Sequence, residues 1–561
     1  MCSIVVVFAL IGIRLVDVQA LGGERYSRLG LDQRLQTIEL AAERGSIFDR
    51  NGNDLAVSVR KQTVFADARV IEDPAGHAAR LAPIVGVPEP ELALKLAQHD
   101  KAFVYIARKV DDAVAEQVRG LDLPGINFVE ESARVYPSNT LAGPVLGFVG
   151  TDNDGLGGLE SGYEAVLAGE PGEVVVERDP QGREIPNGER SVKPAQRGSD
   201  LVLTIDQSLQ YETEQVLVDE VTAARAKGGT AIVMDVQTGD ILAMATVDGP
   251  TDDAPAQPAP ATVSNRAVTD VYEPGSTNKV ITVAGALEQG VVTPETWFQV
   301  PMELVVDDEV FADVESHPTD MTVHDIVRRS SNVGTILVAR ALGSEWFDAY
   351  LRAFGFGAPT GLGFPGESPG IVLALDEYND TSLASMPVGS GIAVTALQML
   401  DVYTTLANGG ATRPPRLVAA TIDADGNLVD EPLEPTRQVV SPETAAAMRG
   451  MLESVVADGT GTNAAIPGYR VAGKTGTARK PPYRGEYVAS FAGFAPADAP
   501  RLAAIVVLDE PGTGSYYGGQ VAAPVFAEIM HSALRLERVP PADASANAAV
   551  APGPGTLNDS P

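Results

Sequence analysis

The chain has 561 residues, 44% of them hydrophobic, so it is long enough for two or more folded domains and is not disordered as a whole. Its 75 acidic and 41 basic residues give a formal net charge of -34, which argues against nucleic acid as a partner because phosphate would be repelled. The single cysteine, Cys2, excludes an intramolecular disulfide, and the five histidines lack metal-ligand spacing, so we predict neither a structural metal nor a cofactor.

An apolar run opens the chain from Cys2 to Ile13 and is followed at once by Arg14. The run is shorter than the about 20 residues that a transmembrane helix needs. We interpret residues 1–21 as the outer end of a membrane anchor whose upstream part is missing, with Arg14 near the interface. A signal-peptide core is one alternative, although a basic segment and a cleavage site are lacking, and a buried strand is another.

Residues 22–195 are predicted to form a mixed α/β module without an internal repeat. Asn51-Gly52 is a strong turn signal, and we expect its flanking strands at 37–40 and 55–59. Short amphipathic helices are predicted at 75–85, 90–96 and 111–119. Proline and glycine interrupt a polar stretch at 191–199, which predicts a domain boundary there.

Residues 196–539 are predicted to form the second domain. Strands are expected at 201–205, 230–235, 241–246, 469–472, 487–494 and 502–508. Helices are expected at 208–226, 441–456 and 525–534, and also after Ser276 and Thr322. Strands at both ends with helices between them predict one antiparallel sheet packed by helices, which is an α+β fold. The Ala/Pro/Gly-rich tail, 540–561, is predicted to be disordered.

A turn at 272–275 leads straight into an apolar helical pattern, which places Ser276 at a helix N-terminus. Residues three apart lie on one face of a helix, so we expect the Lys279 ammonium against the Ser276 hydroxyl. This would be a nucleophile beside a base, with free backbone N–H groups for an oxyanion. An N-cap serine followed by a solvated lysine is the bland alternative.

Two further polar motifs interrupt apolar sequence. The helix that starts at Thr322 stops at Ser330-Ser331-Asn332, and a polar corner of this kind either faces a cleft or simply caps the next helix. Residues 474–477, Lys-Thr-Gly-Thr, follow a predicted strand. Alone, they would fit an ordinary strand that carries an exposed lysine.

Three signals therefore stand in one order: Ser276 with Lys279, Ser330 with Asn332, and Lys474 with the residues that follow it. This trio resembles the active-site motifs of penicillin-binding proteins and serine β-lactamases. Segments outside the motifs look like class B penicillin-binding proteins, namely residues 44–52, 134–137, 265–275 and 471–478. Residues 157–160 and 163–164 look most like the septal, cell-division branch of that class.

The resemblance implies a penicillin-binding, β-lactamase-like transpeptidase domain that follows an elongated, non-catalytic pedestal of the dimerisation type. The chain would be a single-pass cell-membrane protein with its catalytic domain outside the cytoplasm. It would cross-link peptidoglycan during septal cell-wall synthesis. Its partners would be donor and acceptor stem peptides, β-lactams, and a separate glycan polymerase with division proteins in the membrane, but no nucleic acid.

By the same resemblance, Ser276 would attack the carbonyl between the last two D-alanines of a donor stem peptide and form an acyl-enzyme. Lys279 would be the base, and burial together with the charge of Lys474 would lower its pKa. Ser330 would relay a proton toward the leaving amine, and Asn332 would hold Lys279 or the donor amide. An acceptor amine would then resolve the acyl-enzyme, so exclusion of water decides between cross-linking and hydrolysis.

The third motif would bind the donor. Thr475 and Thr477 would hold its terminal carboxylate, and Gly476 would let it approach the strand. The backbone N–H groups of Ser276 and Thr477 would form the oxyanion hole. One departure is Asn278, where the family often has Phe, and on a helix we expect this side chain to point away from Lys279.

Other functions remain open from the motifs alone. A D,D-carboxypeptidase or a β-lactamase would keep the trio but would gain nothing from a pedestal and an anchor. A non-catalytic β-lactam sensor or division scaffold would not need all three motifs intact. A D,D-transpeptidase therefore fits the sequence best.

Overall fold

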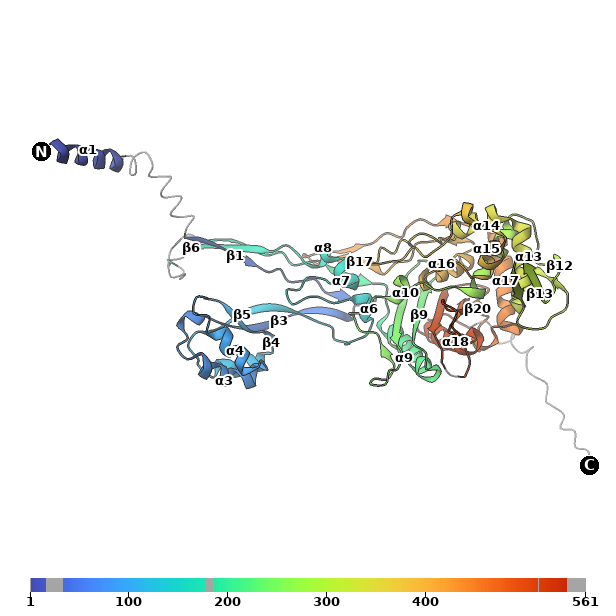
Figure 1. Ribbon diagram of the computed structural model, residues 1–561, viewed down its shortest axis with the longest axis horizontal. Coiled ribbons are helices and arrows are strands. Elements are labelled where there is room, and N and C mark those ends of the chain that lie inside the picture. The colour runs from blue at the N-terminus through green and yellow to red at the C-terminus, as the bar shows by residue number, and fades with distance from the viewer. Residues whose placement is uncertain are drawn as a thin grey trace, which may run out of the picture.

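The computed structural model describes residues 2–16, 34–177, 185–186, 188, 190–512 and 514–541. The molecule is elongated, with α1 (Cys2–Val16) at one end and a large domain of helices and sheet at the other (Figure 1). Long strands connect a small helical head to that large domain. Of the predicted disordered tail, residues 542–561 lie outside the described residues.

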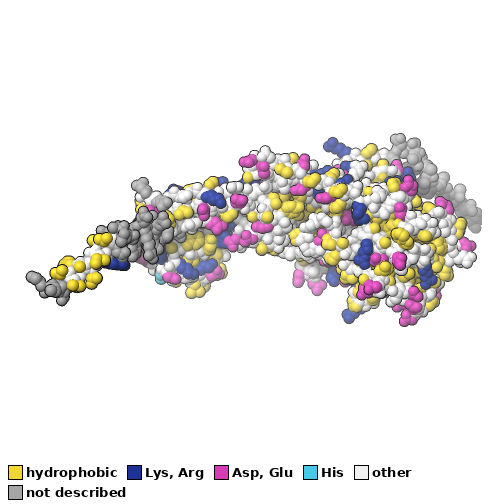
Figure 2. Space-filling view, turned by 90° about the horizontal axis from the view of Figure 1, so that it is seen from above, with side chains coloured by type: hydrophobic (Ala, Val, Ile, Leu, Met, Phe, Trp, Pro, Cys, Tyr) yellow, Lys and Arg dark blue, Asp and Glu magenta, His cyan; other side chains and the backbone are white. Residues whose placement is uncertain are grey.

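Helix α1 presents apolar side chains to its surroundings (Figure 2). The exposed fractions of Phe8 and Ile13 are 70% and 68%. Within the described ranges, no helix combines the length and the apolar character that crossing a bilayer requires. Residues 17–21 of the predicted anchor lie outside the described residues.

One sheet builds the pedestal and reaches the large domain. Its strands are β2 (Ile47–Phe48), β3 (Asp54–Ala66), β4 (Val104–Val110), β5 (Ile126–Val135), β8 (Asp200–Leu203), β17 (Val418–Ile422) and β18 (Leu428–Asp430). They follow the order β18-β17-β8-β2-β3-β4, with β5 paired to β3. Because β17 and β18 come from late in the chain, this sheet joins segments on both sides of the predicted boundary.

The head packs the outer half of β3, with β4 and β5, against α3 (Pro74–Val85), α4 (Glu89–Leu96) and α5 (Asp112–Arg119). These helices confirm the three predicted at 75–85, 90–96 and 111–119. Leu81 and Leu92 are fully buried between them. Asp73 caps α3 by accepting the Gly76 N–H at 2.9 Å, so a local signal fixes where this helix begins.

The turn at Asn51-Gly52 is confirmed, but one of its predicted strands is wrong. The turn joins β2 to β3, and the Asp49 carboxylate accepts the Asn51 N–H at 2.8 Å. Residues 37–40 do form a strand, within β1 (Leu35–Leu40), which pairs instead with β6 (Gly172–Glu177) in a sheet completed by β7 (Arg190–Lys193). The two-residue strand β2 is too short to show any periodicity in sequence.

A six-stranded antiparallel sheet is the centre of the large domain. Its strands are β9 (Gly228–Asp235), β10 (Ile241–Asp248), β11 (Gln257–Pro258), β20 (Ala472–Arg479), β21 (Tyr487–Ala495) and β22 (Leu502–Asp509). They lie in the order β11-β10-β9-β22-β21-β20. The pairing of β9 with β22 confirms that early and late strands share one sheet, and the α+β prediction with it.

The strand predicted at 469–472 is wrong in position, because β20 begins at Ala472 and contains the whole third motif. Tyr469 forms only an isolated bridge with Ile466. The apolar residues of 469–472 carry the stronger local strand signal. Pairing with β21, for example of Lys474 with Ala492, nevertheless makes the glycine-rich motif the strand.

Helices cover both faces of this sheet. Helices α9 (Gln207–Ala224) and α18 (Gly518–Leu536) share a core with one face, and α16 (Ala396–Ala407) shares a core with the other. Helix α9 confirms the helix predicted at 208–226, and α17 (Pro442–Asp458) confirms the one at 441–456. Helix α18 begins before its predicted start at 525, because Gly518 and Pro524 give no helical signal.

The remaining elements are short or surround the sheet. The helices are α6 (Gly143–Leu146), α7 (Gly158–Gly162), α8 (Glu164–Leu167), α10 (Arg266–Thr269), α14 (Ser344–Ala353) and α15 (Asp380–Ser385), with 3-10 turns η2 (Ala68–Val70), η4 (Leu375–Glu377), η5 (Met386–Val388) and η6 (Thr462–Ala464). The strands are β12 (Trp297–Gln299), β13 (Glu303–Val306), β14 (Glu309–Ala312), β15 (Asp320–Thr322), β16 (Ala411–Thr412) and β19 (Arg437–Gln438).

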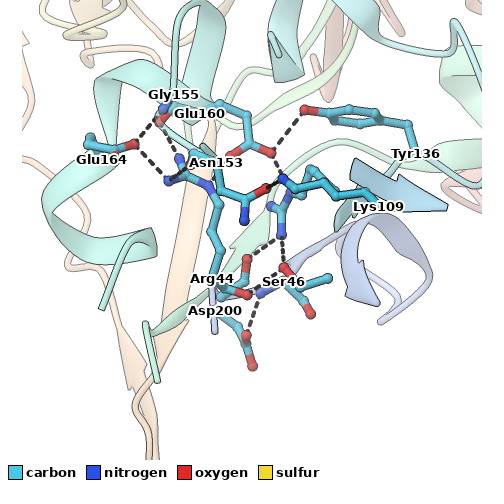
Figure 3. Close-up of polar contacts among 12 residues, drawn as sticks. Arg44, Ser46, Lys109, Tyr136, Asn153, Gly155, Glu160, Glu164 and Asp200 are labelled. Atoms are coloured by element: carbon cyan, nitrogen blue, oxygen red, sulfur yellow. Dashed lines mark hydrogen bonds and ion pairs between the residues drawn. The ribbon is translucent and has the colours of Figure 1, made fainter. Parts of the chain in front are cut away.

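A buried ionic cluster lies where the pedestal approaches the large domain (Figures 1 and 3). The Glu160 carboxylate accepts Arg44 Nε at 2.6 Å and Arg134 Nε at 2.7 Å. The exposed fractions of these three side chains are 2% or less. Arg44 also pairs with Glu164 at 2.7 Å, whose side chain is 37% exposed. One carboxylate thus links the segment before β2, the end of β5 and α7.

Candidate active site

Ser276 lies on η3 (Gly275–Asn278), a 3-10 turn that continues directly into α11 (Lys279–Glu288). It lines a cavity of about 520 Å³. Parts of all three predicted motifs line the same cavity, namely Ser276, Ser330, Asn332, Thr475 and Thr477. The fold therefore brings together motifs that are far apart in the sequence.

Two glycines allow the Ser276 turn to lie against β20. Gly275 has a φ of +56, which glycine adopts without strain, and its N–H donates to the Gly389 carbonyl at 3.0 Å. A Cβ on Gly476 would lie 2.3 Å from Ser490 Oγ and 2.9 Å from the Pro274 carbonyl oxygen. Gly476 is predicted to admit substrate, and it also lets the strand approach the residues before Ser276.

Lys279 is buried, and its ammonium points to the second motif. Nζ donates to the Ser330 carbonyl at 2.5 Å, to Asn332 Oδ1 at 2.7 Å and to Ser330 Oγ at 3.3 Å. Among the described residues, no hydrogen bond joins Nζ to Ser276 Oγ, which differs from the expected contact. Ser330 has a φ of +61, and this left-handed turn directs its carbonyl oxygen to the lysine.

The second motif occupies the corner between α12 (Val323–Arg329) and α13 (Asn332–Leu342). Thr322 caps α12, as predicted, by accepting the Asp325 N–H at 3.1 Å. Ser331 caps α13 by accepting the Gly334 N–H at 2.8 Å. The sequence left open whether this corner caps a helix or faces a cleft. It does both, since Ser331 caps α13 and the corner also lines the cavity.

Asp313, which the sequence did not single out, holds this corner in place. Its carboxylate accepts the Ser331 hydroxyl at 2.6 Å, the Asn332 backbone N–H, and the Val333 N–H at 3.2 Å. His317 Nε2 lies 2.8 Å from the same carboxylate, and both side chains are 3% exposed. No local pattern marks a single aspartate in the connection between β14 and β15, so only the folded structure identifies it.

Lys474 is fully buried, which excludes the exposed lysine considered for the third motif. Its Nζ donates to Ser330 Oγ at 2.7 Å. The Ser330 hydroxyl therefore lies between the two lysines, within hydrogen-bonding distance of Lys279 and of Lys474. Such a hydroxyl can pass a proton between groups on either side of it.

Burial lowers the pKa of Lys279 to about 7, and the Asp313 carboxylate acts in the opposite direction. Burial also lowers the pKa of Lys474 well below its usual range, with a further contribution from the charge of Lys279. The sequence predicted that the charge of Lys474 would lower the pKa of Lys279. In the structure it is the charge of Lys279 that lowers the pKa of Lys474. Because two adjacent ammonium groups repel each other, at least one of the pair is neutral near pH 7.

These pKa values predict the pH dependence of acylation at Ser276. The rate should rise with pH through a midpoint near 7, because only neutral Lys279 can accept a proton. Asp313→Asn removes the charge that raises the pKa of Lys279, so its midpoint should move to lower pH. Rates of acylation by a fluorescent penicillin from pH 5 to 9 would measure the shift. Asp320→Asn, at an exposed site on β15, is the matched control, and an equal shift in both variants would contradict the assignment.

The two threonines of β20, Thr475 and Thr477, line the same cavity. Thr475 Oγ1 lies 3.0 Å from Thr460 Oγ1, and Thr477 Oγ1 accepts the Gly518 N–H at 3.0 Å. Asn278 is buried and donates to the Met386 carbonyl at 2.8 Å, so its side chain points away from the lysine as expected. In the described part of the chain, no group of three or more His, Cys, Asp or Glu is placed to hold a metal ion.

Two family models match the chain. The model described as "Penicillin binding protein transpeptidase domain" matches residues 229–531. The model described as "Penicillin-binding Protein dimerisation domain" matches residues 39–203. Together they cover most of the large domain and of the pedestal.

Relatives align over almost the whole chain. Penicillin-binding protein PbpB of Mycolicibacterium smegmatis is 36% identical over 547 residues, which cover 89% of this chain and 84% of the relative. Peptidoglycan D,D-transpeptidase FtsI of Escherichia coli K12 is 34% identical over 552 residues, which cover 96% of this chain and 91% of the relative.

Solved structures share the fold. A peptidoglycan synthetase from Bifidobacterium adolescentis matches with a TM-score of 0.74 and 30% identity, covering 91% of this chain and 98% of that structure. Penicillin binding protein 3 of Mycobacterium tuberculosis, complexed with ampicillin, matches with a TM-score of 0.69 and 30% identity, covering 90% of this chain and 98% of that structure.

Proposed function

The chain belongs to the class B penicillin-binding proteins, of the septal type that includes FtsI, and we propose that Ser276 is the nucleophile with which it cross-links peptidoglycan stem peptides. It is a serine-type D,D-transpeptidase and a target of β-lactams. One observation supports the assignment above the others. Two buried lysines, Lys279 and Lys474, donate to the Ser330 hydroxyl, and Ser330 lines the same cavity as Ser276.

Acylation follows from these positions. Neutral Lys279 removes the Ser276 proton as Oγ attacks the carbonyl between the last two D-alanines of the donor. The backbone N–H groups of Ser276 and Thr477 stabilise the oxyanion. Lys279 and Ser276 belong to the same turn, and a catalytic hydrogen bond that is absent from the free enzyme can form when substrate binds.

Departure of D-alanine needs a proton at its amine. Ser330 Oγ is 3.3 Å from Lys279 Nζ and 2.7 Å from Lys474 Nζ, so it can relay a proton from either lysine. Asn332 keeps Lys279 in place through its 2.7 Å hydrogen bond. Thr475 and Thr477 hold the terminal carboxylate of the donor through their hydroxyls. The amine of an acceptor stem peptide then attacks the acyl-enzyme, and the cross-link forms.

The apolar surface of α1 supports a second part of the proposal, that the chain is anchored in the cell membrane. Residues 1–21 are part of a single-pass anchor, residues 22–195 a pedestal, and residues 196–539 the catalytic domain outside the cytoplasm. A separate glycan polymerase in the membrane supplies the glycan strands, together with other division proteins. The elongated pedestal would hold the catalytic cavity away from the membrane (Figure 1).

The test is acylation by a fluorescent penicillin, read by intact-protein mass spectrometry. Wild type should gain one adduct, and Ser276→Ala should gain none. The acylation rate should therefore fall by more than the about 10²-fold expected when a single group that only assists the nucleophile is removed. Ser316→Ala, at an exposed serine that lines the same cavity, should acylate like wild type. Acylation of the Ser276→Ala protein would disprove the nucleophile.

Turnover separates a transpeptidase from a carboxypeptidase. Lipid-linked substrate together with a partner polymerase should yield cross-linked dimers. If the same reaction gave only trimmed tetrapeptide, the chain would be a D,D-carboxypeptidase.

A further inference from the structure

A second cavity, of about 390 Å³, lies on the other side of the turn that carries Ser276. It is lined by the residues just before that turn, 270–273, and by the last residues of β20, Ala478 and Arg479. The Ser276 turn and β20 are in close contact here, because a Cβ on Gly275 would lie 3.2 Å from the Thr477 carbonyl oxygen. We refer to this space as the lower cavity.

Most charges around the lower cavity are already neutralised. Arg266 pairs with Asp248, and Lys480 pairs with Asp509 at 2.6 Å and with Glu510 at 2.6 Å. Glu510 also pairs with Lys227 at 3.2 Å, so the positive and negative charges at these positions balance.

Three charged groups without an ion pair among the described residues remain on its wall, namely the exposed Asp270 and Arg479 and the half-buried Glu273. Arg479 makes no ion pair with a carboxylate among the described residues. Asp270 makes no ion pair with a described cation, and within the described residues the only hydrogen bond to its carboxylate comes from the Thr269 hydroxyl, at 3.0 Å. A guanidinium and a carboxylate that line one cavity without pairing suit a ligand with a carboxylate and an amine of its own.

Much of the remaining lining is apolar, although it also includes Thr230 and Glu273. Ala396, Val488 and Val507 are aliphatic residues of the lining, and Tyr272 also belongs to it. The wall is also preformed, since the Tyr272 N–H and carbonyl both bond to Val394 at 3.0 Å. Glu273 accepts the Gly391 N–H and the Tyr483 hydroxyl, each at 3.0 Å. A preformed apolar wall with a few polar groups is typical of ligand sites.

We propose that the lower cavity is a second subsite for a peptidoglycan stem peptide, and that it binds an aliphatic side chain bearing both an amine and a carboxylate. Arg479 pairs with the carboxylate and Asp270 with the amine, while the methylene groups lie against the apolar wall. The proposal rests on the proposed function, because a stem peptide is the ligand only if Ser276 acts on stem peptides. Either stem could supply such a side chain, and in an acceptor its amine would be a different group from the one that attacks the acyl-enzyme, because the lower cavity lies on the other side of the Ser276 turn.

The test uses Arg479→Gln and Asp270→Asn in the full chain, with lipid-linked substrate and a partner polymerase. Each variant should form cross-linked dimers about tenfold more slowly, the effect expected from losing one charge-assisted hydrogen bond. Arg479→Lys, which keeps the charge, should recover most of the rate. Arg484→Gln, at an exposed arginine of the β20–β21 connection, is the matched control. Unfolding temperatures equal to that of wild type would show that the variants are folded.

Release of D-alanine identifies which stem is bound. If the donor occupies the lower cavity, release should fall together with cross-linking. If the acceptor occupies it, release should persist through hydrolysis while cross-linking falls. Cross-linking in Arg479→Gln and Asp270→Asn equal to that in Arg484→Gln would overturn the proposal. Absence of penicillin acylation in wild type would instead overturn the proposed function.

Discussion

Methionine in place of Lys279 should slow the acylation of Ser276 by about 10²–10⁴-fold, the contribution that a positioned general base makes to catalysis. Lys279 is the group with a pKa of about 7 that belongs to the same turn as the nucleophile. Methionine has a similar length but no basic nitrogen. The second-order rate constant with a fluorescent penicillin, taken from intact-protein mass spectra, would measure the loss.

Stability distinguishes this catalytic role from a structural one. Burying an amine is unfavourable, so an apolar side chain of similar volume at position 279 should leave the unfolding temperature unchanged or raise it. Lys227→Met, at a lysine whose side chain is 63% exposed, is the control and should alter neither property. A Lys279→Met protein that acylates within threefold of wild type would rule out Lys279 as the base.

Replacing Glu160 by glutamine should lower the free energy of unfolding by about 3–5 kcal/mol, the cost of leaving a buried charge without its partner. Glu160 is fully buried and accepts from both Arg44 and Arg134, so the buried Arg134 loses its carboxylate partner and Arg44 keeps only the partly exposed Glu164 (Figure 3). Urea unfolding monitored by fluorescence would measure the change.

Glu164→Gln is the matched control for Glu160, because Glu164 pairs with the same Arg44. Its side chain is 37% exposed, so water screens the pair and the loss should not exceed about 1 kcal/mol. If the two variants lost equal free energy of unfolding, burial would not determine how much each ion pair of the cluster stabilises the fold.

Local signals account for the elements that were predicted correctly. The helix at 441–456 begins where Ser441 accepts the Thr444 N–H at 3.2 Å, and the cap and the apolar spacing both lie within one short segment. The same holds for Thr322, which caps α12. Strand partners were less predictable, because pairing is decided between segments far apart in the chain. Residues 37–40 were thus expected beside β3 but lie beside β6.

By itself, the sequence determined the three motifs, their order and the family resemblance, since each is a short pattern of residue types. It also placed Ser276 at the start of a helix, because the turn and the apolar spacing are adjacent. Only the tertiary structure decided what each side chain contacts. Lys279 points to Ser330 and Asn332, and Asp313 holds that corner from a connection without any sequence signal. The physical reason is that the pKa of a buried lysine and the partner of a carboxylate depend on groups that the fold alone brings within a few ångströms.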